Sequence, residues 1–116
     1  MKRVVITGVG IVSCIGNDKN EVLNSLQNTK SGIVFSEDHK KYKFRSQVVG
    51  SVKNLNLSEH IHRKQLRFMG DGSAYNYIAM NEAVKDSGLE EKDISNITTG
   101  MIMGSGGPSI ENVILA

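Results

Sequence analysis

Two glycine-rich segments offer backbone amides that could hold an anion. The first, Gly8-Val9-Gly10, follows the β-branched run Val4–Thr7. A glycine turn after a strand can bring backbone N–H groups onto a pyrophosphate, so a nicotinamide-binding oxidoreductase is one hypothesis. The dinucleotide pattern G-x-G-x-x-G is incomplete, because Ser13 stands where the third glycine belongs. A structural turn at Gly8 and Gly10 is the favoured interpretation.

The second segment, the glycine loop Gly104-Ser105-Gly106-Gly107, is followed by Pro108 and comes directly after the apolar run Thr99–Met103. Such a loop is typical either of an anion nest or of a place where another backbone approaches closely. It does not match a phosphate-binding Walker loop, because no Gly-Lys-Ser/Thr follows. The sequence leaves both interpretations open.

The single cysteine and the three histidines do not form an obvious reactive centre. Cys14 has Ser13 and Ile15 beside it, and neither is a base or a cation that would activate a thiol. A small buried cysteine is therefore the favoured interpretation.

The histidines do not predict a metal site either. His60 and His62 are two residues apart and fall on different faces of a helix, while the adjacent cations would repel a metal ion. His39 stands alone in a lysine-rich segment. We predict no metal and no cofactor.

A basic cluster, Arg63, Lys64 and Arg67, lies in a predicted helical region that begins at Leu57. Arg63 and Arg67 are four residues apart and share one helix face. A solvated helix face and a docking surface for an acidic partner both fit this pattern. The residues alone do not decide between them.

The elements that position these residues have the pattern of an α/β protein. Val4–Thr7 and Thr99–Met103 are continuous apolar or β-branched runs, which predict strands buried on both faces of a sheet. Asp18 and Glu21 form a capping arrangement that predicts a helix ending near Thr29. We expect a single α/β unit.

The middle of the chain is more varied. Residues 33–46 are polar and predict a surface excursion, and Val48, Val49 and Val52 predict a short strand beyond it. A broad apolar stripe from Ala74 to Val84 predicts a long helix that ends at Gly88.

The composition fits a single soluble domain: of 116 residues 39% are hydrophobic and 22% charged, with a net charge of +2. Nothing in this balance calls for nucleic acid as a partner. No run approaches the roughly 20 apolar residues of a membrane span. The glycines at 8 and 10 interrupt the apolar start, which disfavours a secretory signal. A cytoplasmic protein without membrane contact is expected, and the apolar end Ile114-Leu115-Ala116 predicts a truncated piece of a longer polypeptide.

Five stretches together resemble one family. They are RVVITGVGIVSCIGN at 3–17, SGI at 31–33, RSQVVGSVK at 45–53, RKQLRFM at 63–69 and GSGGPS at 104–109. In this order they are similar to the N-terminal portion of the β-ketoacyl-acyl carrier protein synthases, ketosynthases of the thiolase superfamily. The segment at 45–53 and the Gly106-Gly107-Pro108 turn favour type I, the elongating enzyme of bacterial fatty acid synthesis.

The resemblance implies a partial thiolase-like fold, part of the first half of an α-β-α-β-α layered sandwich, in a homodimeric acyltransferase. Residues 1–116 would be the N-terminal part of its N-terminal domain. The reaction implied is a decarboxylative condensation of an acyl thioester with malonyl-acyl carrier protein. The family's nucleophilic cysteine, its two histidines and its lysine are matched by no residue here, and Cys14 does not fit the nucleophile motif. The resemblance therefore assigns no catalytic residue to this chain and predicts that it is inactive alone.

Two sites carry over from the family. Arg63, Lys64 and Arg67 match its basic docking surface for acyl carrier protein, which is strongly acidic. Gly104, Ser105, Gly106 and Gly107 match a loop beside the acyl-chain pocket near the dimer interface. A non-catalytic module that binds acyl carrier protein is the alternative hypothesis.

Overall fold

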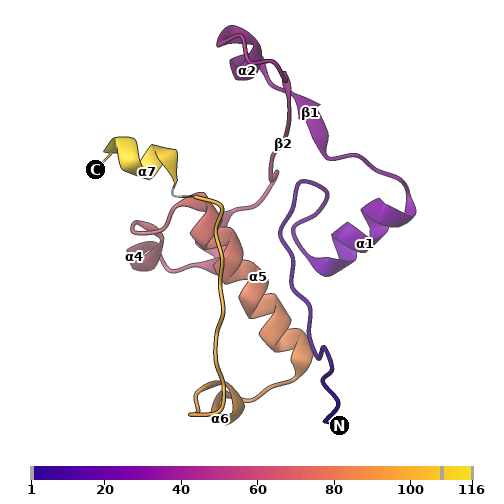
Figure 1. The fold of residues 1–116 in the computed structure, drawn as a ribbon, viewed down its shortest axis with the longest axis vertical. Helices are drawn as coiled ribbons and strands as arrows, with labels where there is room; N and C mark the ends of the chain where they lie inside the picture. The colour runs from indigo at the N-terminus through magenta and orange to yellow at the C-terminus, as the bar shows by residue number, and fades with distance from the viewer. Residues whose placement is uncertain (1, 108, 116) are drawn as a thin grey trace. The chain divides into compact units, whose positions relative to one another are not determined.

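A computed structural model describes residues 2–107 and 109–115 of the chain (Figure 1). The chain divides into two compact units rather than the single one expected from the sequence. We call Ile11–Leu55 the hairpin unit, and the described residues of 1–10 and 56–116 the helical unit. Pro108 and Ala116, which the sequence patterns include, lie outside the described residues.

Each unit contributes its own elements. The hairpin unit contains α1 (Lys19–Gln27), β1 (Ile33–Phe35), α2 (Glu37–Lys41) and β2 (Val48–Gly50). The helical unit contains α3 (Leu57–His60), α4 (Arg63–Leu66), α5 (Asp71–Ser87), α6 (Glu91–Ile94) and α7 (Ile110–Leu115). Helices with one small antiparallel sheet make up the described structure, which is compatible with part of an α/β fold.

The start of α1 confirms the predicted cap. The Asp18 carboxylate accepts hydrogen bonds from the backbone N–H groups of Asn20 and Glu21, at 2.8 and 2.9 Å. The Glu21 carboxylate accepts one from the N–H of Asn17 at 2.8 Å. These bonds satisfy amides that have no partner inside the helix. The helix ends at Gln27, two residues before the predicted limit at Thr29.

The sheet pairs β1 with β2 in antiparallel register, with Val34 opposite Val49. The prediction of a strand at Val48 and Val49 is confirmed, although β2 ends at Gly50 and does not include Val52. The interpretation of residues 33–46 as a surface excursion was incomplete, because Ile33–Phe35 is the partner strand. Its flanking residues are polar, so the sequence around it hid a strand of only three residues.

Cys14 packs against glycine backbone in the hairpin unit. It lies in a turn in which Ser13 and Gly16 exchange backbone hydrogen bonds of 2.9 and 3.4 Å. A Cβ added at Gly32 would lie 2.8 Å from the Cys14 Sγ, and one at Gly50 would lie 3.0 Å from it. The cysteine therefore occupies space that two neighbouring glycines leave open, and it is partly buried.

In the helical unit α5 carries the core. Ala74 and Ile78 of α5 are buried, as is Ile61 after α3. The helix ends at Ser87, and Gly88 adopts the left-handed conformation with φ of 69°. Glycine is favoured there because it has no Cβ to clash, so the predicted stop is confirmed.

The first glycine segment lies directly against α5. A Cβ on Gly10 would stand 1.8 Å from the carbonyl oxygen of Ala79, and one on Gly8 would stand 2.1 Å from that of Ala83. The Val9 N–H donates a hydrogen bond to the Asp86 carboxylate at 3.0 Å. The expectation of a turn here was wrong: residues 2–10 form neither a turn nor a regular element, and the glycines permit close approach of this segment to the helix.

The two predicted buried strands are not formed within the described residues. Val4–Thr7 and Thr99–Met103 take no strand conformation and are exposed along their length, with Val4 94% and Ile102 98% accessible. A strand requires a neighbour that accepts and donates its backbone hydrogen bonds. Neither segment has such a neighbour in the part of the chain that the structure describes, so neither forms a strand despite its strand propensity.

Among the helices of the described residues, none combines the length and the apolar character needed to cross a bilayer.

Candidate functional site

The α4 surface, formed by Arg63, Lys64 and Arg67, lies on a single turn of helix and its C-terminal cap. The helix begins after His62, whose Nδ1 accepts a hydrogen bond from the Lys64 N–H at 3.2 Å. The Arg67 N–H donates to the carbonyl of Arg63 at 3.3 Å, which places the two arginines one turn apart. All three side chains are exposed.

Helix α4 has four residues, so its first and last turns coincide and its dipole gives no preference for or against these cations. Within the described residues no carboxylate forms a salt bridge with any of the three. The α4 surface thus presents uncompensated positive charge to solvent.

Phe68 extends this surface with an aromatic ring. The Arg67 guanidinium carbon lies 4.9 Å from the centroid of the Phe68 ring, within the range of a cation–π contact. The sequence patterns did not single out Phe68. An aromatic residue directly after a basic cluster, outside the apolar stripe of the helix, is the signal that could have found it.

The glycine loop is closed by its serine. The Ser105 Oγ donates a hydrogen bond to the Gly107 carbonyl at 2.8 Å and accepts one from the Gly107 N–H at 3.4 Å. A Cβ added at Gly104, Gly106 or Gly107 would meet nothing within 4 Å. Close approach of another backbone, one of the two interpretations of this loop, is therefore wrong for the described residues.

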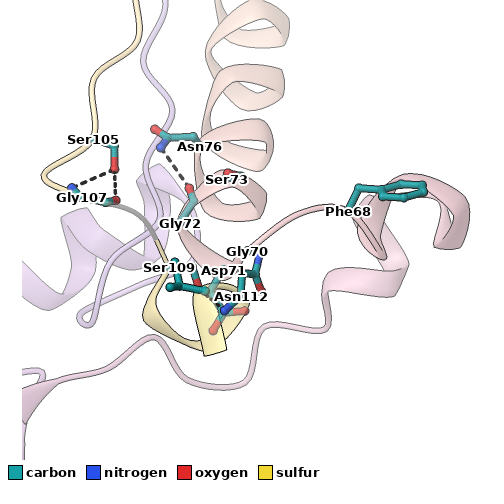
Figure 2. Close-up of a pocket in the computed structure, with 11 residues that line it drawn as sticks. Phe68, Gly70, Asp71, Gly72, Ser73, Asn76, Ser105, Gly107, Ser109 and Asn112 are labelled. Atoms are coloured by element: carbon teal, nitrogen blue, oxygen red, sulfur yellow. Dashed lines mark hydrogen bonds between the residues drawn. The ribbon is translucent and has the colours of Figure 1, made fainter. Parts of the chain in front are cut away.

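A cavity of about 850 Å³ lies beside the glycine loop (Figure 2). Phe68 lies at one end, and Ser105 and Gly107 of the glycine loop form part of the wall. Ser73 and Asn76, from the first turns of α5, also line this cavity. The Asn76 Nδ2 is turned back to donate to the Gly72 carbonyl at 3.0 Å. Arg63, Lys64 and Arg67 do not line this cavity, so the structure does not bring the basic cluster and the glycine loop into one site.

A second cavity of about 470 Å³ also borders the loop. Met69, Met80, Met101 and Met103 line it together with Gly104. Methionine side chains are flexible and polarisable, and they adapt to apolar groups of varied shape. The loop therefore borders two cavities, and methionine side chains line the smaller one.

The electrostatics near the loop involve one shifted group. Partial burial raises the pKa of the Tyr75 phenol above its usual value of 10.0, and the negative charge of Asp71, one helical turn earlier, adds to the effect. Asp71 also lines the larger cavity.

The remaining chemical candidates lie elsewhere. Among the described residues, no group of three or more His, Cys, Asp or Glu is placed to hold a metal ion. His39 packs edge-on against Phe44 with ring centroids 5.0 Å apart, and its buried Nδ1 has no hydrogen-bond partner. Gly8 and Gly10 are turned toward the backbone of α5, which leaves no space for a pyrophosphate on that face. This packing argues against the nicotinamide hypothesis.

The sequence model of the family described as "Beta-ketoacyl synthase, N-terminal domain" matches residues 1–114. The chain belongs to this family. The resemblance derived from the five sequence stretches is thereby confirmed.

Individual relatives are similar over the whole chain. The 3-oxoacyl-[acyl-carrier-protein] synthase 1 of Haemophilus influenzae is 51% identical over 116 residues, which cover 100% of this chain and 28% of the relative. The Escherichia coli K12 protein of the same name is 50% identical over 110 residues, 94% of this chain and 27% of that protein. The 3-oxoacyl-[acyl-carrier-protein] synthase 2 of Staphylococcus aureus strain N315 is 35% identical over 117 residues, 99% of this chain and 28% of that protein. The higher identity to the proteins named synthase 1 supports the resemblance to type I, and the chain spans about 28% of the length of such relatives.

Proposed function

We propose that residues 1–116 form the N-terminal part of a β-ketoacyl-acyl carrier protein synthase that elongates fatty acids. The observation that carries this proposal is the 51% identity, over the entire chain, to a protein named 3-oxoacyl-[acyl-carrier-protein] synthase 1. In such an enzyme a cysteine thiolate takes the acyl group from its carrier as a thioester. Malonyl-acyl carrier protein loses carbon dioxide, and the resulting carbanion attacks that thioester and releases the cysteine.

This chain supplies surfaces to that reaction rather than its reacting groups. The exposed apolar segments Val4–Thr7 and Thr99–Met103 fit strands of a thiolase-like sheet whose neighbours belong to other parts of the enzyme. The glycine loop, with open space at Gly104, Gly106 and Gly107, fits the wall of the acyl pocket. A homodimer in the cytoplasm is part of this proposal.

The activity is tested on the natural full-length polypeptide that contains this sequence. Purified protein supplied with acyl- and malonyl-acyl carrier protein should yield a β-ketoacyl product two carbons longer, with one carbon dioxide per product, measured by mass spectrometry. Residues 1–116 alone should yield none. Absence of product from the full-length polypeptide would contradict the synthase proposal.

The α4 surface is proposed to dock acyl carrier protein. Within the described residues no carboxylate forms an ion pair with its three exposed cations. They therefore attract an acidic partner electrostatically, and added salt screens this attraction.

Charge reversal tests the docking surface. In the full-length polypeptide, Arg63→Glu with Arg67→Glu should weaken binding of acyl carrier protein by well over tenfold, since each change replaces attraction by repulsion. The control, Lys40→Glu with Lys41→Glu, changes the net charge equally on exposed residues of α2. Affinity measured by fluorescence anisotropy should fall for the first pair only. An equal loss for both pairs would mean that total charge, not the α4 surface, governs binding.

A non-catalytic module that binds acyl carrier protein is the second candidate. It is favoured by one observation: the docking residues lie within this chain, whereas Cys14 is packed between the glycine backbones at 32 and 50. Carrier binding without condensation by the full-length polypeptide would establish this alternative.

A further inference from the structure

Phe68 is an exposed aromatic residue whose apolar neighbours Leu66 and Met69 are partly covered. Its side chain is 78% accessible. Burial of a phenylalanine is among the larger favourable contributions that one side chain can make. The segment therefore presents its largest apolar group to the outside.

The backbone around Phe68 holds the ring in place. The Phe68 N–H donates to the Gln65 carbonyl at 3.0 Å, and the Met69 N–H donates to the Leu66 carbonyl at 3.0 Å. These bonds continue α4 as tight turns beyond its last residue. Figure 2 shows the ring at the end of this segment, apart from the other residues that line the cavity. An anchor on a fixed backbone loses little conformational freedom on binding.

The charge around the ring is positive. Arg67 stacks on the ring at 4.9 Å, and Arg63 precedes Arg67 by one turn of the same helix. An apolar ring flanked by exposed arginines matches an acidic surface that also offers an apolar group. Aromatic and arginine residues in this combination are those that dominate binding energy at protein interfaces.

We propose that Phe68 is the apolar anchor of the α4 surface and inserts into an apolar site on acyl carrier protein. This inference rests on the proposed function. The charged and apolar residues would then have different roles. The cations attract the carrier and set the salt dependence of binding, while Phe68 slows dissociation of the carrier. The cation–π contact holds the Arg67 guanidinium beside the Phe68 ring.

The test uses the natural full-length polypeptide and acyl carrier protein, with affinity measured at several ionic strengths. Phe68→Ala should weaken binding about tenfold to a hundredfold, the range expected for loss of one buried phenylalanine, without changing the slope against salt. Phe68→Leu, which keeps an apolar side chain, should lie within about threefold of the parent protein. Arg67→Ala should instead flatten the salt dependence.

Tyr42→Ala is the matched control. Tyr42 is also an exposed aromatic residue, 65% accessible, in contact with a cation, since the Lys41 Nζ lies 5.3 Å from its ring centroid. It lies in the hairpin unit, away from the α4 surface in sequence, and its loss should leave affinity unchanged.

Three outcomes would overturn the inference. Unchanged affinity of Phe68→Ala removes the anchor but leaves the docking proposal intact. A lower melting temperature of Phe68→Ala, with unchanged carrier affinity of the folded protein, means that the ring is covered by the polypeptide itself or by a second copy. If the parent protein does not bind acyl carrier protein, the proposed function fails and the anchor fails with it.

Discussion

The two glycine-rich segments of the helical unit follow similar apolar runs, yet their glycines have opposite surroundings. At Gly8 and Gly10 the missing side chains let this segment approach the backbone of α5, where a Cβ would overlap with carbonyl oxygens. At Gly104, Gly106 and Gly107 a Cβ would meet nothing within 4 Å. The first pair is required by packing inside the unit, and the second set leaves space that the unit itself does not use.

This difference shows that a glycine-rich sequence does not by itself reveal why glycine is needed at each position. Glycine is suited to positive φ, to close approach and to open space, and the sequence looks the same in each case. Among the described glycines only Gly88 has a positive φ, so backbone conformation does not explain either segment. The neighbours of each glycine decide its role.

The largest expected effect is that of Gly10→Ala. Its methyl group would stand 1.8 Å from the Ala79 oxygen and 2.6 Å from the Ala83 nitrogen, and backbone atoms cannot rotate away as a side chain can. We expect the free energy of unfolding of the full-length polypeptide to fall by at least about 3 kcal/mol. Urea denaturation measures this loss.

Gly106→Ala is the matched control for that change. It enters open space at a residue without positive φ, and it should leave stability unchanged or raise it by up to about 1 kcal/mol. Equal destabilisation by both alanine substitutions would contradict the proposed difference in packing between the two glycine segments.

A larger side chain in the glycine loop tests whether the open space there has a role in activity. Gly106→Val should leave the free energy of unfolding within about 0.5 kcal/mol, because no atom lies within 4 Å of the added Cβ. If the loop borders the acyl pocket, kcat/KM for a long acyl chain should fall about tenfold, equivalent to about 1.4 kcal/mol. A short acyl substrate should react as before. An equal loss for both chain lengths would contradict the pocket assignment.

Loss of the hydrogen bond between the Val9 N–H and the Asp86 carboxylate of α5 should have a smaller effect on stability. Asp86→Ala removes the acceptor of the Val9 N–H and should destabilise the protein by about 1 kcal/mol. The exposed position and the nearby helix C-terminus, which disfavours a carboxylate, keep this value low. Asp86→Asn retains an acceptor oxygen and should lose less. Thermal melts of the two variants compare these losses, and an equal loss would mean that the Val9 bond is not the cause.

The smallest effect concerns Tyr75 near the opposite end of α5. Burial, assisted by Asp71, raises the pKa of its phenol, so the folded state holds this proton more tightly than the unfolded state does. This contribution to stability is complete below pH 10.0 and is lost as the pH rises through the higher folded pKa. Asp71→Asn should lower the pKa only partly, because burial is the larger cause. Ultraviolet titration, with Tyr75→Phe to assign the signal, measures the shift, and an unchanged pKa would exclude Asp71 as a contributor.

Local signals in the sequence predicted local structure well. The cap of α1 at Asp18 and Glu21 and the end of α5 at Gly88 depend on hydrogen bonds and backbone angles within a few residues. Such features need no distant partner, so their residues are sufficient to predict them. The strand at Val48 was also found, but its partner Ile33–Phe35 was not, because a strand this short has no periodicity to detect.

The candidate site was predicted in part. The basic cluster and the glycine loop were found from residue types and from resemblance to a family that the chain is now known to belong to. Phe68 and the cavity between α5 and the loop were not found, because a cavity is defined by segments 30 or more residues apart, as Phe68 and Ser105 are. Likewise, the sequence does not show whether a large aromatic residue is exposed; the tertiary structure does.

The sequence by itself determined the family, the start of α1, the end of α5 and the positive charge of the α4 surface, since each depends on residue identity and near neighbours. The tertiary structure alone decided that Gly8 and Gly10 pack against α5, that the glycine loop is open, and that Val4–Thr7 and Thr99–Met103 have no strand partner within the described residues. Packing and strand pairing are contacts between distant segments, and the same local sequence permits more than one of them.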